Sequence, residues 1–299
     1  MRVVALFCGM KRARIRFIFN LRNLFLLLMA TAVVFLLFLF SRDELQNYEA
    51  VDGPLFIANY VETPPAFTGE IKVISWNIKF AEKMDQAISE LQSITALQAA
   101  DVLLLQEMDE TAVDDIAQTL GYNHVYFPAS VHNQTGRNFG NAILSVWPLT
   151  NPKKILLPHE NPTNQQTRNA VQATAVIAGQ DVQLVSVHTE TIWLSDEKRK
   201  EQVDALVAAI EPDAEIVIVG GDFNTVSEGE VTAVADRFTE IGMDHVSAGA
   251  EPTVIKAGLA ITADHVFARG VTLIENGVWL ETEASDHFPV WVHLTLDKD

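Results

Sequence analysis

Five short segments place acids, amides or histidines at the ends of apolar runs that are typical of buried strands. They are residues 75–77, 106–107, 186–188, 220–224 and 285–287. Burying a charged group without a partner is costly. Several strand ends that converge on one pocket with a cation would remove that cost. The pattern therefore predicts a metal-dependent hydrolase.

Hydrophobic runs predict the elements that would position these segments. Strands are predicted at residues 71–76, 102–105, 139–146, 170–177, 182–187, 216–219, 266–267, 271–280 and 290–296. Helices are predicted at residues 84–97, 110–120 and after Ser195, where apolar residues recur at helical spacing. Strands mixed with helices and hairpins imply a layered α/β domain with sheets inside and helices outside.

Charge is distributed unevenly along the chain. The formal net charge is −18, from 21 basic and 39 acidic residues. Seven of the bases and none of the acids precede position 43, so the remainder has 14 bases against 39 acids. This negative charge would repel a phosphate backbone unless a bound metal or a local basic patch compensates for it. Solubility or salt adaptation explains an acidic surface equally well. The single cysteine, Cys8, excludes an internal disulfide and a cysteine-based zinc site.

Residues 23–41 contain no charged side chain and are predicted to be a transmembrane anchor. Nineteen helical residues rise about 28 Å, close to the hydrocarbon thickness of a bilayer. The basic leader, residues 1–22, predicts a single-pass protein with a cytoplasmic N-terminus and its body on the far side, which is the periplasm in a bacterium. The competing interpretation, a cleaved signal peptide, lacks a small-residue cleavage site. Residues 42–69 are predicted to be a linker and residues 70–299 the catalytic domain.

Taken in order, the polar segments resemble the endonuclease/exonuclease/phosphatase superfamily over about residues 70–297. The most specific pieces are Gly221-Asp222-Phe223-Asn224 and Ser285-Asp286-His287-Phe288-Pro289, which occur together with Trp76-Asn77, Gln106-Glu107 and His188. The resemblance implies a four-layer α/β sandwich of two packed mixed β-sheets flanked by helices, here preceded by the N-terminal transmembrane helix. It also implies cleavage of phosphate esters with Mg²⁺ or Mn²⁺.

The resemblance further implies roles by position for the metal site and the attacking water. Glu107 would be the principal metal ligand, since a carboxylate is the hard oxygen donor that Mg²⁺ prefers. Asn77 and Asp286 would complete the metal site. Asp222 would orient or deprotonate the attacking water, and Asn224 would donate its amide to the phosphate.

Proton transfer and phosphate contact would fall to a second group of residues. His287 would contact the phosphate and move protons, with Asp264 orienting its ring. The residues that flank Asp264 depart from the family pattern, which more often has isoleucine before this acid and an aromatic residue after it. His188 would bind a non-bridging oxygen or assist the leaving group. Asn141 and Arg168 are weaker candidates for contact with the substrate phosphate.

The predicted function is a phosphodiesterase that acts at a membrane surface on a small or lipid-linked substrate. One alternative is an endonuclease or exonuclease, so that nucleic acid is a possible partner but not the favoured one. A second alternative is a non-catalytic, membrane-tethered binding module on the same fold, against which the intact polar set argues. The expected specificity loops, at about 128–138, 158–168 and 247–262, carry no motif. The sequence therefore leaves the natural substrate and the oligomeric state open.

Overall fold

The computed structural model describes residues 26, 28–31, 33, 46–250, 252–256 and 258–296. The chain divides into two compact units, Met1–Glu44 and Leu45–Asp299. The predicted basic leader, residues 1–22, lies outside the described residues, and so does most of the predicted anchor, residues 23–41. No helix within the described ranges has both the length and the apolar content needed to cross a bilayer.

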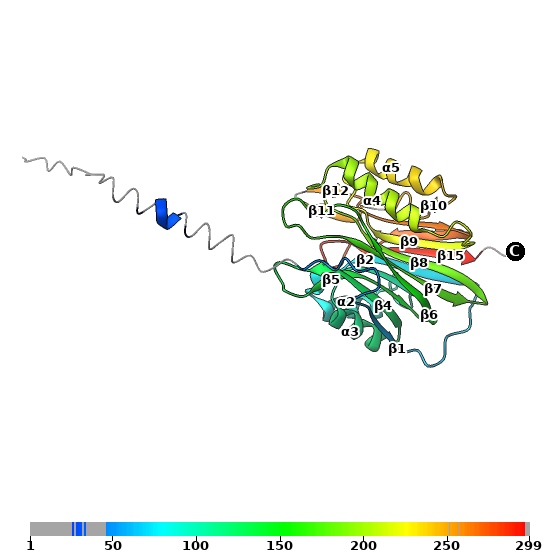
Figure 1. Cartoon of the computed structure of the whole chain (residues 1–299). Coiled ribbons are helices and arrows are strands. Elements are labelled where there is room, and N and C mark those ends of the chain that lie inside the picture. Colours follow the sequence, from blue (N-terminus) through cyan, green and yellow to red (C-terminus); the bar gives the residue numbers. More distant parts are fainter. Residues whose placement is uncertain are drawn as a thin grey trace, which may run out of the picture. The chain divides into compact units, whose positions relative to one another are not determined.

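The second unit is built on two large mixed β-sheets (Figure 1). The seven-stranded sheet has the order β1 (Phe56–Asn59), β4 (Asn123–Val131), β5 (Asn138–Ser145), β3 (Val102–Met108), β2 (Glu70–Asn77), β15 (Val290–Leu296) and β14 (Val271–Val278). The six-stranded sheet has the order β10 (Asp244–His245), β13 (Asp264–Arg269), β9 (Ile216–Asp222), β8 (Gln180–His188), β7 (Asn169–Ile177) and β6 (Leu149–Leu156). Each sheet contains a parallel pair, β2 with β3 and β8 with β9. Strands β11 (Val254–Lys256) and β12 (Leu259–Ile261) form a separate hairpin.

Apolar side chains fill the space between the sheets and the space under the helices. Along β3, Leu104 belongs to the core between the sheets, whereas Leu103 and Leu105 belong to the core on the outer face. This alternation explains the continuous apolar run, because both faces of the strand are covered. Helices α2 (Met84–Ser93) and α3 (Glu110–Leu120) cover one sheet, and α4 (Asp196–Ala209) and α5 (Glu228–Thr239) cover the other. The predicted four-layer sandwich is confirmed.

The segment predicted to be a linker is packed onto the body from residue 46 onward. Asn47 bridges Ser130 of β4, and β1 adds an edge strand to the larger sheet. The Nζ atom of Lys154 donates to the backbone oxygens of Tyr48 and Gly53, at 3.1 and 2.6 Å. These contacts use backbone groups, which leave no periodic pattern in the sequence. The compact unit therefore begins earlier than residue 70.

Candidate active site

The two parallel strand pairs bring their carboxyl ends to the same edge of the sandwich. Asn77 ends β2, and Glu107 is the penultimate residue of β3. In the other sheet, His188 ends β8 and Asp222 ends β9, and these two residues are paired in register. Asp264 begins β13, where it pairs with Asp222. The fold thereby gathers polar groups from both sheets into one site.

Glu107 reaches the site through a local irregularity in β3. The pairing of β3 with β5 shifts register between Leu105 and Met108, and Glu107 has φ of +59°. Such a conformation is strained for a residue other than glycine, and strain of this kind is concentrated at functional sites. The two carboxylate oxygens accept from the Asn77 side-chain nitrogen at 3.1 Å and from the Phe80 backbone nitrogen at 3.2 Å.

Burial raises the pKa of Glu107. Within the described residues its hydrogen-bond donors are neutral groups, so its charge is not cancelled by a direct contact with lysine or arginine. A bound divalent cation would cancel that charge, because the carboxylate oxygens of Glu107 are the hard ligands that such a cation prefers. The donor set at Glu107 therefore fits the metal that the resemblance implies.

Asp286 lies at the exposed side of the same site. Its side chain is 57% exposed and its Oδ2 atom lies 3.8 Å from the Nζ atom of Lys79. The negative charge of Asp286 adds to the rise in the pKa of Glu107, after the larger effect of burial. The two carboxylates thus share one electrostatic environment. The ligand role of Asp286 stays a prediction.

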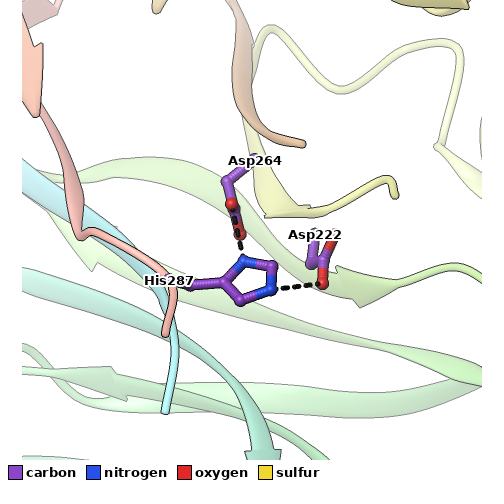
Figure 2. Close-up of side chains that lie close together, drawn as sticks. All are labelled: Asp222, Asp264 and His287. Carbon is purple, nitrogen blue, oxygen red and sulfur yellow. Dashed lines mark hydrogen bonds and ion pairs between the residues drawn. The ribbon is translucent and has the colours of Figure 1, made fainter. Parts of the chain in front are cut away.

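His287 lies between two buried acids (Figure 2). Its Nδ1 atom is 2.9 Å from Asp264 Oδ2, and its Nε2 atom is 3.7 Å from Asp222 Oδ2. Burial by itself would lower the pKa of His287, but the carboxylates of Asp264 and Asp222 outweigh burial and raise it. Burial also raises the pKa of Asp222. The geometry therefore favours a cationic ring held by Asp264.

The ligand atoms of Asp222, Asp264 and His287 lie within 4.8 Å of one another, so the trio is a second group that could hold a metal. Sequence reasoning did not assign this set. A cationic imidazole has no free lone pair for a metal. The trio therefore suits a hydrogen-bonded chain for proton transfer better than a cation site. The metal-ligand role of Glu107 stays a prediction.

His188 is held by a buried ion pair that the sequence did not reveal. Arg168 donates to Glu190 through Nε at 3.1 Å and Nη2 at 3.3 Å, and its Nη1 atom lies 3.4 Å from His188 Nδ1. Arginine can only donate, so His188 Nδ1 accepts, and its Nε2 atom carries the proton. That Nε2 atom lies 3.4 Å from Asp222 Oδ2. Burial and the nearby Arg168 keep the pKa of His188 well below its ordinary value.

Asn224 and Asn141 make local contacts in the structure. The backbone nitrogen of Asn224 donates to Asp222 Oδ1 at 2.8 Å, and its side-chain nitrogen donates to the Thr189 backbone oxygen at 3.0 Å. Asn141 is buried, and its side-chain nitrogen donates to two oxygens of Asn169. Asn224 therefore shapes the loop around Asp222, whereas Asn141 ties β5 to β7. Their contacts with substrate phosphate stay predictions.

Several neighbours of the site were missed by sequence reasoning. Glu190 lies only two residues after His188 in the sequence. This closeness to a predicted site residue was the one signal that could have identified Glu190 as a neighbour of the site. Phe139 lies under Arg168, with 5.0 Å between the guanidinium carbon and the ring centroid. Phe80 stacks on His132 with ring centroids 4.2 Å apart. These aromatic contacts cannot be predicted from residue spacing, because they join segments that are far apart in the sequence.

Two packed mixed sheets with one polar edge define an α/β-sandwich hydrolase. Residues 74–287 match the profile of the Endonuclease/Exonuclease/phosphatase family, and the chain belongs to this family. The sequence is 26% identical over 231 residues to a UPF0294 protein of Vibrio parahaemolyticus, covering 77% of this chain and 79% of the relative.

Solved structures show the same fold. An endonuclease/exonuclease/phosphatase from Beutenbergia cavernae matches with a TM-score of 0.63 and 20% identity, over 76% of this chain and 72% of the other. D. rerio TDP2 complexed with single strand DNA product matches with a TM-score of 0.57 and 21% identity, over 76% of this chain and 99% of the other.

Proposed function

We propose that the chain is a divalent-metal-dependent phosphodiesterase that acts at a membrane surface on a small or lipid-linked phosphodiester. The observation that carries the proposal is that Glu107, His188 and the Asp264–His287 pair converge around Asp222 at one edge of the sandwich. Family membership supports phosphate-ester hydrolysis as the reaction class.

Glu107, with Asp286 and Asn77, would hold Mg²⁺ or Mn²⁺. The ion would polarise a phosphoryl oxygen and stabilise the charge that develops on it. Asn77 has a further role in the structure, because its side-chain nitrogen donates to both Glu107 and Asp222. One amide nitrogen thereby bridges the two carboxylates and offsets part of their mutual repulsion.

The two histidines differ in charge, and this difference suits them to different tasks. His287, whose pKa is raised by neighbouring acids, would present a charged N–H to a phosphate oxygen. His188, whose pKa is lowered, would present a neutral N–H from Nε2. Asp222 lies between them and has a raised pKa, which suits a group that takes a proton from the attacking water near neutral pH.

The proposed topology has the N-terminus in the cytoplasm and the catalytic unit on the far side of the membrane. The support is the uncharged stretch 23–41 with bases before it. Alkaline phosphatase and green fluorescent protein fused after residue 299 report opposite locations. An active phosphatase fusion with a dark fluorescent fusion is expected, and the reverse pair would overturn the topology.

Nucleic acid is the second candidate substrate, favoured by the likeness in fold to D. rerio TDP2 with its single strand DNA product. The charge of this body argues against it. The two basic clusters seen in the sequence, residues 153–154 and 198–200, contain Lys154 and Arg199, and both are buried. Arg199 pairs with Asp196 and Glu230. These two cations are therefore not available to a DNA backbone.

The test is kcat/KM on duplex DNA, on a lipid headgroup phosphodiester and on a small phosphodiester. The comparison uses matched Mg²⁺ and about 0.15 M salt, where surface charges are already screened. We expect the small or lipid-linked substrate to be preferred. A kcat/KM on DNA that is about tenfold higher or more, equal to about 1.4 kcal/mol, would show instead that the protein is a nuclease. Hydrolysis of none of the three would support the non-catalytic binding module.

A further inference from the structure

Large apolar side chains are exposed on three loops around the active site. Trp193, which is 66% exposed, lies on the loop that follows His188 at the end of β8. Leu259, which is 67% exposed, lies on the β11–β12 hairpin. Val226, also exposed, lies on the third loop, which follows Asp222 at the end of β9. We call the exposed apolar side chains of the three loops the apolar rim: Ile192, Trp193, Val226, Ile255 and Leu259.

The base of the β11–β12 hairpin is joined directly to the catalytic residues. Val254 bridges His287, and the Thr253 backbone oxygen accepts from Phe288 at 2.7 Å. The Thr253 side-chain oxygen accepts from the backbone nitrogen of Asp264 at 3.1 Å. The hairpin lies on the left side of the body in Figure 1. The hairpin therefore adjoins the catalytic edge of the sandwich, and the loops that carry Trp193 and Val226 leave the strands β8 and β9 at that same edge.

The chain enters the body at this same edge. The backbone oxygen of Gln46 accepts from Val131 at 2.8 Å, and Val131 ends β4 beside the start of β5. The start of β5 pairs with Met108, next to Glu107. In the sequence, the uncharged stretch 23–41 ends five residues before Gln46. Five extended residues reach at most about 18 Å, which is short compared with the size of a domain.

We infer that the apolar rim docks on the surface of the bilayer that holds the proposed anchor. Exposed apolar side chains that occur singly need no explanation, but several around one site mark an interaction surface. Tryptophan is enriched at membrane interfaces, where its ring is apolar and its N–H stays hydrated. Lys256, exposed beside Ile255 on the hairpin, can place its stem in the apolar region and its ammonium among headgroups.

The inference rests on the anchor in the proposed function and extends it to the substrate. With the anchor and the rim engaged together, the catalytic edge would face the headgroups. A phosphodiester that links a lipid to its headgroup would then reach Glu107 and His287 without leaving the bilayer. A protein partner or a second copy of this chain would also cover an apolar rim, and these are the competing outcomes of the test.

The test uses the full chain reconstituted in phosphatidylcholine vesicles whose acyl chains are brominated near the headgroup. Bromine quenches tryptophan fluorescence only at close range. We expect wild-type fluorescence to fall in brominated vesicles compared with unbrominated ones, and Trp193→Phe to lose a large part of that fall. Trp147→Phe is the matched control, because Trp147 is buried and lies at the opposite end of β5.

Two further readouts separate this inference from the proposed function. Flotation with the vesicles reports the anchor, and hydrolysis of a soluble phosphodiester reports catalysis. Protein that floats and hydrolyses, but whose quenching is the same in wild type and Trp193→Phe, would overturn the rim alone and favour a protein partner. Protein that does not float would overturn the anchor and the rim together. Quenching that depends on Trp193 in a protein without hydrolysis would support the rim and contradict the catalytic assignment.

Discussion

The side-chain nitrogen of Asn77, at the end of β2, lies 3.0 Å from Oδ2 of Asp222, at the end of β9. This contact joins the two sheets beneath the site. The same nitrogen lies 3.1 Å from Oε1 of Glu107, while the Asn77 side-chain oxygen accepts from the Lys79 backbone nitrogen at 3.1 Å. In this structure Asn77 is thus a donor to two acids.

Substitutions of Asn77 distinguish two roles of its side chain: hydrogen-bond donor to the two acids, through its nitrogen, and metal ligand, through its oxygen. An aspartate at this position cannot donate and adds a third negative charge, so Asn77→Asp is expected to lower kcat more than Asn77→Ala. If the oxygen of Asn77 served mainly as a metal ligand, the added carboxylate would tighten metal binding instead. The measurement is kcat and the Mg²⁺ concentration for half-maximal rate in both variants. Tighter Mg²⁺ binding with near-normal kcat in Asn77→Asp would refute the donor role.

Because the Arg168–Glu190 pair is buried, we expect removal of the arginine alone to destabilise the fold strongly, and removal of both charges to restore much of the stability. Arg168→Gln leaves Glu190, which is fully buried, without its cation, and removing one partner of a buried pair costs about 3–5 kcal/mol. Adding Glu190→Gln should restore much of the free energy of unfolding. Arg237→Gln is the control, since Arg237 pairs with Asp204 at the surface, where such pairs contribute about 0–1 kcal/mol. Chemical unfolding that shows equal losses for the two arginine variants would contradict the assignment.

His188 is predicted to act in the chemical step. Loss of its Nε2 proton donor in His188→Ala should lower kcat by about 10²–10⁴-fold, the usual contribution of general acid–base groups, with a small effect on KM. His293→Ala is the control, because His293 lies on β15 and pairs with Glu275 of β14. An unchanged kcat with a raised KM in His188→Ala would restrict the role of His188 to substrate binding.

A chain of hydrogen bonds behind the site predicts how stability depends on pH. His265 Nε2 lies 2.8 Å from Thr225 Oγ1, which donates to the Thr262 backbone oxygen at 2.6 Å, and His265 Nδ1 lies 3.1 Å from His245 Nε2. The Thr225 hydroxyl uses its proton on Thr262, so His265 Nε2 donates to it and His265 Nδ1 accepts. This arrangement requires a neutral ring at His265. Burial lowers the pKa of His265 to about 3.

The unfolded chain, with an ordinary histidine pKa near 6.5, therefore binds a proton that the folded chain excludes. Stability from this group is complete above about pH 6.5 and falls as the pH decreases toward 3. At pH 5 the expected loss is about 2 kcal/mol relative to pH 7. His265→Gln should show a smaller loss between pH 7 and pH 5, while His159→Gln should match the wild type. The three unfolding free energies at both pH values provide the check, and equal losses in all three proteins would count against the neutral ring.

Much of the fold and site follows from the sequence because the relevant signals are local. The apolar run 102–105 ends at Gln106-Glu107, and the run 216–219 ends at Gly220-Gly221-Asp222. Runs of this kind predict buried strands, and the polar residues that follow them predict which edge carries the site. The parallel pairing of β2 with β3 and of β8 with β9 then brings the ends together.

Other features depend on contacts that no local pattern encodes. Strand β6 contains Lys154, which reads as a surface charge, yet its ammonium is buried against the backbone oxygens of Tyr48 and Gly53. Helix α5 buries only Val234 and Phe238 along its length, too few for a clear helical period. The buried ion pair of Arg168 has no local signal either, because its partner Glu190 lies 22 residues away in the sequence.

The central claim is divalent-metal-dependent phosphodiester hydrolysis centred on Glu107. The most direct measurement is the rate of bis-p-nitrophenyl phosphate hydrolysis by the full chain with Mg²⁺, after EDTA treatment, and after Mg²⁺ is restored. We expect EDTA to abolish the rate and Mg²⁺ to restore it. We also expect Glu107→Ala to lower the rate by about 10²-fold or more, equivalent to about 2.7 kcal/mol of transition-state stabilisation. Asp115→Asn, an exposed acid on α3, should keep the wild-type rate. Full activity in EDTA-treated protein, or an unimpaired Glu107→Ala enzyme, would contradict the account.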